Sequence, residues 1–432
     1  MYHTTQSHIP VRLPPLPYTG ILCRYNEIAT KGRNRGLFEN LLVENLHRQL
    51  QPITKFKGKR RRGRILLVPH GRENDLFSAS DVECLRQRIQ RVFGISSVSP
   101  VIETSPELAA VEKVVEDCFP LVYQSFAEAK PRGAIRYAMR ARRVSRRHPM
   151  SSHELELHFA GRLLPAYPRL QVDLQNPELL VQLEMRETSA FLSFLNFPGP
   201  GGMPSGCAGR TLALLSGGFD SPVAAYLMMR RGCPLDFITF HSAPYTPPAT
   251  LAKVARLART LNQYQRPGRL FCINLLPAQK AVRDLCNPRY RTVLYRRFMV
   301  RIACRIAEEY RILGLATGDN LGQVASQTME NLFVVNKVAD RPVFRPLLTY
   351  DKNHTLALAR NLGTFEISRE DAPDSCTVFA PSRPTTMAKP DKIEENEKPL
   401  EVVDLIAACL ADSTIMNPDT EEQTPLPQPV RS

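Results

Sequence analysis

The sequence lacks the patterns that mark secreted, disulfide-rich and zinc-binding proteins. Its ten cysteines include no Cys-x-x-Cys pair, which argues against a zinc site and a disulfide framework. The N-terminus has prolines and polar residues where a secretory signal would have a basic start and an apolar run. No segment approaches the length needed to cross a membrane. These absences predict a cytoplasmic protein with no membrane partner.

Acidic residues are missing from two stretches of a chain that is basic overall. The net charge of +15 at pH 7 favours an acidic partner, of which nucleic acid is the commonest. No Asp or Glu occurs at 45–72 or at 130–153, and both stretches are rich in Lys and Arg. We predict that they contact RNA phosphates; the alternative is a solvated surface. The residues predicted to bind RNA are Lys57, Lys59, Arg60, Arg61, Arg62, Arg140, Arg142, Arg143, Arg146 and Arg147.

The segment 211–231 has the features of a phosphate-binding strand, loop and helix. An apolar run at 211–215 is followed by small, turn-forming residues and then by a helix-compatible stretch. The loop has neither the Gly-Lys-Ser/Thr of a Walker A loop nor the Gly-x-Gly-x-x-Gly of dinucleotide-binding folds. Because Gly217 and Gly218 carry no Cβ, backbone N–H groups beside them can approach an anion closely.

The residues that follow these glycines also suit a phosphate ligand. Ser216 and Ser221 add hydroxyl donors, and Ser221 before Pro222 predicts a helix N-cap followed by the first helical position. The helix N-terminus would then direct its partial positive charge at the ligand. Asp220 would repel a bare phosphate, so its presence predicts a bridging Mg2+. The alternative is an ordinary turn between a strand and a helix, which uses the same residue types.

Strands and helices are predicted on both sides of a Gly/Pro-rich linker at 198–206. After the linker they alternate regularly, which predicts a parallel sheet covered by helices, with ligands beyond the carboxyl ends of the strands. Residues 1–19 are proline-rich and polar and predict a flexible leader. Residues 397–432 are acidic and proline-rich with one apolar patch, and predict a disordered tail.

Several motifs resemble those of one known family. Ser-Gly-Gly-x-Asp-Ser-Pro-Val-Ala at 216–224 resembles the pyrophosphate loop of the PP-loop ATP pyrophosphatases, and more closely that of the tRNA 4-thiouridine synthetases. Arg-Tyr-x-Glu-Ile-Ala-x-Lys-Gly-x-Asn-Arg at 24–35 is similar to the opening of the same family. Leu-Gly-Gln-Val-Ala-Ser-Gln-Thr at 321–328 is close to a family signature, although the preceding Asp319-Asn320 departs from the more usual Glu-Ser.

The resemblance implies an α/β and α+β multidomain protein. Its parts would be an N-terminal ferredoxin-like α+β domain at 20–78, a THUMP α/β RNA-binding domain at 79–197 and a parallel-sheet PP-loop domain, similar to adenine nucleotide alpha hydrolases, at 198–396. The implied cofactors are ATP and Mg2+. The implied nucleotide contacts are Leu214, Leu215, Ser216, Gly217, Gly218, Ser221, Thr239, Phe240, Arg296, Gly318 and Gln327. The implied catalytic residues are Asp220, Lys352 and Cys376.

The family reaction that the resemblance implies has two steps. ATP adenylates O4 of uridine 8 in tRNA, and sulfur from a cysteine persulfide, supplied by a cysteine desulfurase, displaces AMP and leaves 4-thiouridine. Some family members also supply sulfur for the thiazole of thiamine. A homodimer is one assembly that the resemblance allows.

Cys376 is the residue on which sulfur transfer depends in this interpretation. Many relatives have two adjacent cysteines there, and some carry a rhodanese domain with a second sulfur-carrying cysteine, for which the segment after residue 396 is too short. Cys207 and Cys233 both remain candidates for a partner thiol.

Two other functions are compatible with parts of the sequence. One is a different PP-loop tRNA-modifying ligase, such as a 2-thiouridine or amidating enzyme. The basic N-terminal half and Cys376 argue against amidation of a small molecule. The other is a non-catalytic tRNA-binding protein with an inactive nucleotide site, against which the intact Ser-Gly-Gly-x-Asp-Ser loop argues.

Overall fold

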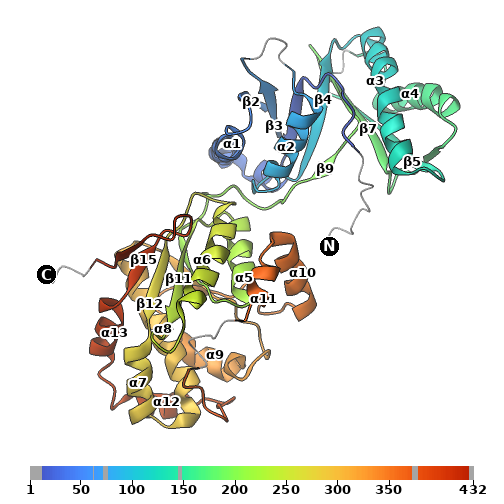
Figure 1. Ribbon diagram of the computed structural model, residues 1–432. Helices are drawn as coiled ribbons and strands as arrows, with labels where there is room; N and C mark the ends of the chain where they lie inside the picture. The colour runs from blue at the N-terminus through green and yellow to red at the C-terminus, as the bar shows by residue number, and fades with distance from the viewer. Residues whose placement is uncertain (1–11, 62, 72–75, 145–147, 372–377, 428–432) are drawn as a thin grey trace. The chain divides into compact units, whose positions relative to one another are not determined.

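The computed structural model describes residues 12–61, 63–71, 76–144, 148–371 and 378–427 (Figure 1). The chain divides into two compact units, Met1–Pro204 and Ser205–Ser432, and each contains its own sheet and apolar core. Within the described ranges, no helix combines the length and the apolar character that a membrane crossing requires.

One nine-stranded sheet runs through the N-terminal unit in the order β2-β3-β1-β4-β8-β7-β5-β6, and β9 also pairs with β4. Pairing is antiparallel except where β5 joins β6 and β7 in parallel. The strands are β1 (Gly20–Arg24), β2 (Phe56–Arg61), β3 (Arg64–Pro69), β4 (Ser97–Thr104), β5 (Ile135–Arg143), β6 (Leu170–Val172), β7 (Leu179–Met185), β8 (Ala190–Ser193) and β9 (Phe197–Pro198). The α-helices are α1 (Arg35–Leu50), α2 (Ala79–Ile89), α3 (Leu108–Ala129) and α4 (Ser152–Ala166).

The four helices pack into a single apolar core with this sheet. Two of them begin at capping boxes: Ser78 Oγ accepts from the Asp81 N–H of α2, and Ser151 Oγ accepts from the Glu154 N–H of α4. Each carboxylate in turn accepts from the backbone N–H of its serine, so N–H groups at the helix start are satisfied. Because β4 pairs with both β1 and β8, one sheet and one core extend through both predicted N-terminal domains.

The described part of the predicted leader belongs to this core. Leu16 and Tyr18 are buried, Tyr18 forms an isolated β-bridge with Phe77, and its hydroxyl donates to Pro14 O at 2.9 Å. The expectation of a flexible leader is therefore wrong for residues 12–19, because these apolar side chains have a place in the core. Residues 1–11 lie outside the described residues.

The predicted Gly/Pro linker is held against the N-terminal unit. Gly199 N–H donates to Ser96 O, and Gly201 N–H donates to Ile95 O. A Cβ at Gly199 would lie 2.3 Å from Ile95 O, so this close approach of two backbones requires glycine.

A seven-stranded sheet forms the centre of the C-terminal unit, in the order β14-β13-β10-β11-β12-β15-β16. The first five strands in that order pair in parallel, as the alternating pattern predicts, and β15 and β16 add an antiparallel edge. The strands are β10 (Thr211–Leu214), β11 (Leu235–His241), β12 (Leu270–Asn274), β13 (Gly314–Ala316), β14 (Val343–Phe344), β15 (Thr414–Met416) and β16 (Gln423–Pro425).

Helices cover both faces of this sheet (Figure 1). Helix α5 packs with α10 and α6 on one face, while α7, α8 and α13 contribute to the core on the other. The helices are α5 (Asp220–Arg230), α6 (Pro248–Asn262), α7 (Leu276–Leu285), α8 (Arg291–Glu309), α9 (Met329–Asn336), α10 (Lys352–Leu362), α11 (Phe365–Arg369), α12 (Pro390–Glu397) and α13 (Val402–Ala411).

The expectation of a disordered tail after residue 396 is wrong for the described residues. The apolar patch forms α13, whose Cys409 is fully buried in the core. β15 then pairs along β12, and Asn274 Nδ2 donates to Asp412 Oδ2 at 2.7 Å. The physical reason is that β12 would otherwise present an unpaired edge, which the C-terminal segment covers.

Candidate functional site

The phosphate-loop candidate lies between β10 and α5, as predicted, but its serine acts differently from the prediction. Helix α5 begins at Asp220, so Ser221 is inside the helix and is not its N-cap. Ser221 Oγ instead accepts from Ser216 N–H at 2.9 Å and lies 3.1 Å from Ser216 Oγ. The Ser221 hydroxyl accepts the hydrogen bond of a backbone N–H group of the loop. This bond joins the loop to the first turn of α5.

Gly318 approaches this turn from the end of β13. A Cβ at Gly318 would lie 2.6 Å from Ser221 N and 2.8 Å from Ser221 Cα, so no larger residue fits without displacing α5. Gly318 thus sets the spacing between the chain that follows β13 and the first turn of α5.

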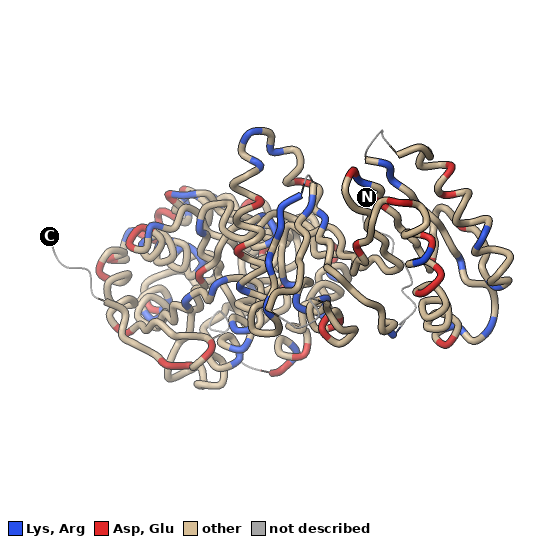
Figure 2. The backbone as a smooth tube through the Cα atoms, turned by 90° about the horizontal axis from the view of Figure 1, so that it is seen from above, with Lys and Arg blue, Asp and Glu red and all other residues tan. Residues whose placement is uncertain are grey.

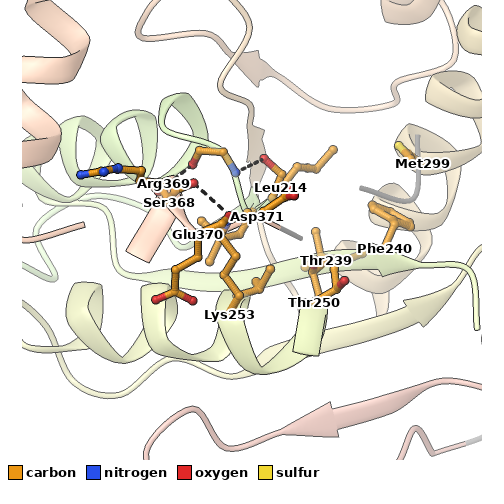
Figure 3. Close-up of a pocket in the computed structure, with 16 residues that line it drawn as sticks. Leu214, Thr239, Phe240, Thr250, Lys253, Met299, Ser368, Arg369, Glu370 and Asp371 are labelled. Atoms are coloured by element: carbon orange, nitrogen blue, oxygen red, sulfur yellow. Dashed lines mark hydrogen bonds between the residues drawn. The ribbon is translucent and has the colours of Figure 1, made fainter. Parts of the chain in front are cut away.

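A cavity of about 500 Å³ opens at the carboxyl ends of β10 and β11 (Figure 3). Seven of the predicted nucleotide contacts line it: Leu214, Leu215, Ser216, Gly217, Gly218, Thr239 and Phe240. The other four, Ser221, Arg296, Gly318 and Gln327, are not among its lining residues. Polar loop backbone on one side and apolar side chains such as Phe240 and Met299 on the other suit a ligand with phosphates and a flat apolar ring.

Arg296 belongs to a buried charge network beside the loop. It donates to Asp319 and, at 2.8 Å, to Ser326 O, while Arg345 Nε lies 3.2 Å from Asp319 Oδ2. Burial alone would raise the pKa of Asp319, but the charge of Arg296 and a hydrogen bond from Thr317 lower it below its ordinary value. This network ties the signature segment at 317–328 to α8, and it explains how the unusual Asp319 is accommodated.

Asp220 and Lys352 meet although 132 positions separate them in sequence. Lys352 Nζ, at the start of α10, lies 3.0 Å and 3.1 Å from the two carboxylate oxygens of Asp220. Gln323 Nε2 also donates to Asp220 at 3.1 Å. The pair is partly exposed, at the N-terminus of α5 and next to the phosphate loop, so two of the three predicted catalytic residues lie together.

Models of the relevant families match three parts of the chain. A ThiI ferredoxin-like domain matches residues 20–99, a THUMP domain matches 111–195, and the family described as thiamine biosynthesis protein (ThiI) matches 206–402. A probable tRNA sulfurtransferase of Moorella thermoacetica is 37% identical over 94% of this chain and 99% of its own. The chain belongs to the tRNA sulfurtransferase family. A second probable tRNA sulfurtransferase, of Brevibacillus brevis, is 38% identical over 92% of this chain and 96% of its own.

A solved structure of the same family has a similar fold throughout. The crystal structure of a 4-thiouridine synthetase–RNA complex with bound ATP superposes with a TM-score of 0.77 at 31% identity. It covers 92% of this chain and 98% of the other. The structure of PH1313 from Pyrococcus horikoshii Ot3, at 23% identity and a TM-score of 0.58, has the same fold over 80% of this chain.

The family motifs did not indicate several residues of the cavity wall. Thr250 and Lys253 of α6 line it, as do Ser368, Arg369, Glu370 and Asp371 at the end of α11. A signal for Lys253 was present in the sequence, because this lysine occupies the apolar stripe of α6 with Val254, Leu257 and Leu261. A charged residue on such a stripe needs a polar partner in the fold.

Cys376, the third predicted catalytic residue, lies outside the described residues. Asp371, the last described residue before it, lines the cavity beside the loop. Of the two candidate partner thiols, Cys233 is buried, and burial raises its pKa. Cys207 is more accessible. The structure therefore favours Cys207 over Cys233 for thiol chemistry that needs an accessible thiolate.

The basic residues predicted to bind RNA lie on two strands of the N-terminal unit. Lys57, Lys59, Arg60 and Arg61 are exposed on β2, at the edge of the sheet, and Arg140 and Arg142 are exposed on β5. Arg143 is less exposed, and its guanidinium donates to His148 O at 3.1 Å, which is a local structural contact. Arg62, Arg146 and Arg147 lie outside the described residues. Contact of these residues with RNA remains a prediction.

Proposed function

We propose that this protein is an ATP-dependent tRNA uridine 4-sulfurtransferase, which forms AMP, pyrophosphate and 4-thiouridine. The observation that carries the proposal is the cavity lined by the phosphate loop, with the Asp220–Lys352 pair at the helix start beside it. A 4-thiouridine synthetase that binds RNA and ATP matches the chain over 92% of its length, which supports the assignment. The proposed target is uridine 8 of tRNA.

In the first proposed step, O4 of the uridine attacks the α-phosphorus of ATP. The new O4–P bond forms as the bond between the α-phosphorus and the pyrophosphate oxygen breaks, the electron pair leaves with pyrophosphate, and the N3 proton goes to solvent. The loop at 216–219 and the N-terminus of α5 bind the phosphates through backbone N–H groups. The positive charge of Lys352 lies where it can stabilise phosphate oxygens and orient Asp220.

The residues around Asp220 are compatible with Mg2+. This ion takes one or two carboxylates from a protein and its other ligands from phosphates and water, so a single aspartate beside a phosphate loop is a sufficient protein contribution. The described residues contain no cluster of three or more side chains that would form a complete metal site by themselves. Asp220 would hold the ion, which supplies charge neutralisation to the phosphates when bound.

In the second proposed step, sulfur replaces the activated oxygen. A persulfide on Cys376, supplied by a cysteine desulfurase, attacks C4 of the uridine, the C4–S bond forms and AMP leaves with the electron pair. A second thiol, for which we propose Cys207, then attacks the Cys376 sulfur; the bond between the two sulfurs breaks and 4-thiouridine is released. The resulting disulfide must be reduced by an external dithiol before the next turnover.

Further aspects of the assignment rest on the family alone. We propose a cytoplasmic location, where a desulfurase and tRNA are available. The description of the matching family as a thiamine biosynthesis protein supports a second role in sulfur supply for the thiazole of thiamine.

The test is mass spectrometry of tRNA nucleosides from cells with and without this protein. We expect 4-thiouridine to disappear from the deleted strain and to return when the wild-type gene is restored. The purified protein should also release pyrophosphate from ATP only when tRNA is present. Unchanged 4-thiouridine in the deleted strain would contradict the proposal.

A further inference from the structure

The phosphate loop of this protein contains no basic residue. Between Arg210 and Arg230 the chain has neither Lys nor Arg, so the loop and most of α5 supply backbone N–H groups and hydroxyls but no positive side chain. A triphosphate is a polyanion, and its binding in a partly dry cavity requires a cation with which to pair. That cation must come from another part of the fold.

Lys253 of α6 lies against the loop. The residue is 5% exposed and lines the cavity (Figure 3). Gly217 and Gly218 line the same cavity. A Cβ placed on Gly217 would be 3.3 Å from Lys253 Cδ and 3.4 Å from both Cε and Nζ. The end of the Lys253 side chain therefore occupies the space next to Gly217, which a larger residue at this position would need.

The hydrogen bonds of Lys253 connect the loop to the end of α11. Lys253 Nζ donates to Ser368 O at 3.0 Å and to Glu370 O at 2.6 Å, and Ser368 Oγ donates to Gly218 O at 3.1 Å. Hydrogen bonds from Arg256 lower the pKa of the Glu370 carboxylate, and the charge of Lys253 contributes to the same shift, so the ammonium already interacts with this acid. An anionic ligand in the cavity would be a further charge partner.

We propose that Lys253 is a second phosphate-binding lysine of this site, in addition to Lys352. It supplies from α6 the cation that a Walker A loop carries within its own sequence, and it binds the β- and γ-phosphates that leave as pyrophosphate. By holding Ser368 and Glu370 at the same time, it makes the end of α11 part of the phosphate site. This inference depends on the proposed function only through its ATP site.

The test is calorimetric titration of the full-length protein with ATP, inorganic pyrophosphate and AMP. Lys253→Gln keeps a neutral donor toward the carbonyls but removes the charge. We expect its affinity for ATP and pyrophosphate to fall roughly 10- to 100-fold, the cost of losing a charge-assisted hydrogen bond. Its affinity for AMP, which lacks those phosphates, should stay within about threefold, well below one such bond.

Arg256 provides a matched control on the same helix. Its guanidinium holds the Glu370 carboxylate, with Nη1 2.7 Å from Oε1, but it lies on the exposed side of α6 and does not line the cavity. Arg256→Gln should leave all three affinities within about threefold. If it weakens ATP and pyrophosphate as much as Lys253→Gln does, Lys253 acts only by holding Glu370, and the proposal is overturned.

Other outcomes are also decisive. Equal losses for AMP, ATP and pyrophosphate, or unchanged pyrophosphate binding by Lys253→Gln, overturn the phosphate role of Lys253 while leaving the ATP site intact. If Lys253→Gln does not fold, Lys253→Arg and Lys253→Met are compared, and pyrophosphate binding should be kept by the first and lost by the second. A wild-type protein that binds neither ATP nor pyrophosphate contradicts the proposed function itself.

Discussion

Two aspartates near the phosphate loop have different surroundings and, we infer, different tasks. Asp319 is buried and pairs with Arg296, Arg345 and the Thr317 hydroxyl. Its charge is therefore compensated within the protein. Asp220 is partly exposed at the N-terminus of α5 and pairs with Lys352 at the surface. An exposed pair is easily rearranged when a charged ligand arrives, whereas a buried network is not. We therefore expect Asp220 to be the carboxylate that interacts with the nucleotide.

Asp220→Ala is expected to abolish ATP turnover. The substitution removes the carboxylate at the phosphate loop, so AMP release should fall roughly 100-fold or more, as when one preorganised electrostatic group is removed from an active site. Binding of tRNA should stay within about twofold, since the basic residues lie in the other unit. The measurements are AMP release and filter binding of tRNA, with Asp404→Ala on the exposed side of α13 as the control. Normal AMP release by Asp220→Ala would contradict the assignment of Asp220 as a catalytic residue.

Cys376→Ser separates sulfur transfer from activation. We expect tRNA-dependent pyrophosphate release, the product of activation, to continue while 4-thiouridine is lost, because serine cannot carry or accept persulfide sulfur. Pyrophosphate release measures activation, and nucleoside mass spectrometry of the same samples measures sulfur transfer. Cys84→Ser, which changes an exposed cysteine of α2, should keep both activities. Full thiolation by Cys376→Ser would instead indicate an external sulfide donor.

The environments of Cys207 and Cys233 predict which thiol reacts. Burial raises the pKa of Cys233, so it stays protonated and protected near neutral pH, whereas Cys207 is only partly buried. We expect iodoacetamide to label Cys207 faster than Cys233, as followed by peptide mass spectrometry at pH 7.5. After one turnover without reductant, a Cys376–Cys207 disulfide should be found. A Cys376–Cys233 disulfide would show that the C-terminal unit opens during the reaction.

Glu397, at the end of α12, joins this helix to α8 through buried contacts with two arginines. Glu397 accepts two hydrogen bonds from Arg297, at 2.8 Å and 2.6 Å, and two from Arg301, at 2.7 Å and 2.9 Å. The Glu397 and Arg297 side chains are 9% and 4% exposed. Helix α12 leads into α13 and the edge strands, so this contact attaches the C-terminal segment to the unit that holds the cavity.

Glu397→Gln should lower the free energy of unfolding by about 3 kcal/mol, because it leaves Arg297 buried without its charged partner. Burial would raise the pKa of Glu397, but hydrogen bonds from Arg301 and Arg297 lower it below its ordinary value. A lowered folded pKa means that the stabilisation is complete above the unfolded value, about 4.3, and is lost as the pH falls through the folded value.

Urea unfolding at pH 7 and in acid measures both effects. The difference in the free energy of unfolding between wild type and Glu397→Gln should become smaller once the pH falls below about 4.3. The control is Glu394→Gln on the same helix, which removes only an exposed pair with Lys337 and should cost less than about 0.5 kcal/mol. A free-energy difference that stays the same as the pH falls below about 4.3 would contradict the lowered pKa of Glu397.

The whole molecule places its predicted RNA-binding residues and its nucleotide cavity in separate units. Lys and Arg positions occur in both units and are interspersed with acidic positions (Figure 2). What distinguishes β2 and β5 is that their exposed basic residues follow one another along a strand with no acidic residue between them in the sequence. Such a row suits the phosphates and shape of folded RNA. Net charge alone does not identify the binding surface.

Replacing Lys59, Arg60 and Arg61 with Ala tests this surface. We expect weaker tRNA binding and a salt dependence that flattens by up to about 0.9 in the log–log slope for each phosphate that the variant no longer neutralises. The control removes the same charge from the C-terminal unit by replacing Lys389, Lys392 and Lys398, all exposed near α12. Equal slopes for the two triple variants would show that β2 is a solvated surface.

The sequence alone determined the elements and the local chemistry of the site. Apolar runs and alternation predicted the strands of the parallel sheet, and the small residues at 216–221 predicted the phosphate loop, because both depend on interactions between near neighbours. The family motifs predicted Asp220 and Lys352 as functional residues. Seven of the nucleotide contacts that the sequence predicted line the cavity.

Tertiary structure decided what depends on contacts between distant residues. It brought Lys352 to Asp220, placed Lys253 against Gly217, and assigned Ser221 to the loop backbone although its local pattern predicted a helix cap. It also folded the acidic, proline-rich C-terminus onto β12, since the gain from covering an open strand edge is invisible in local composition. Local propensity is a property of a segment, whereas the partner that satisfies a buried charge or a strand edge is a property of the fold.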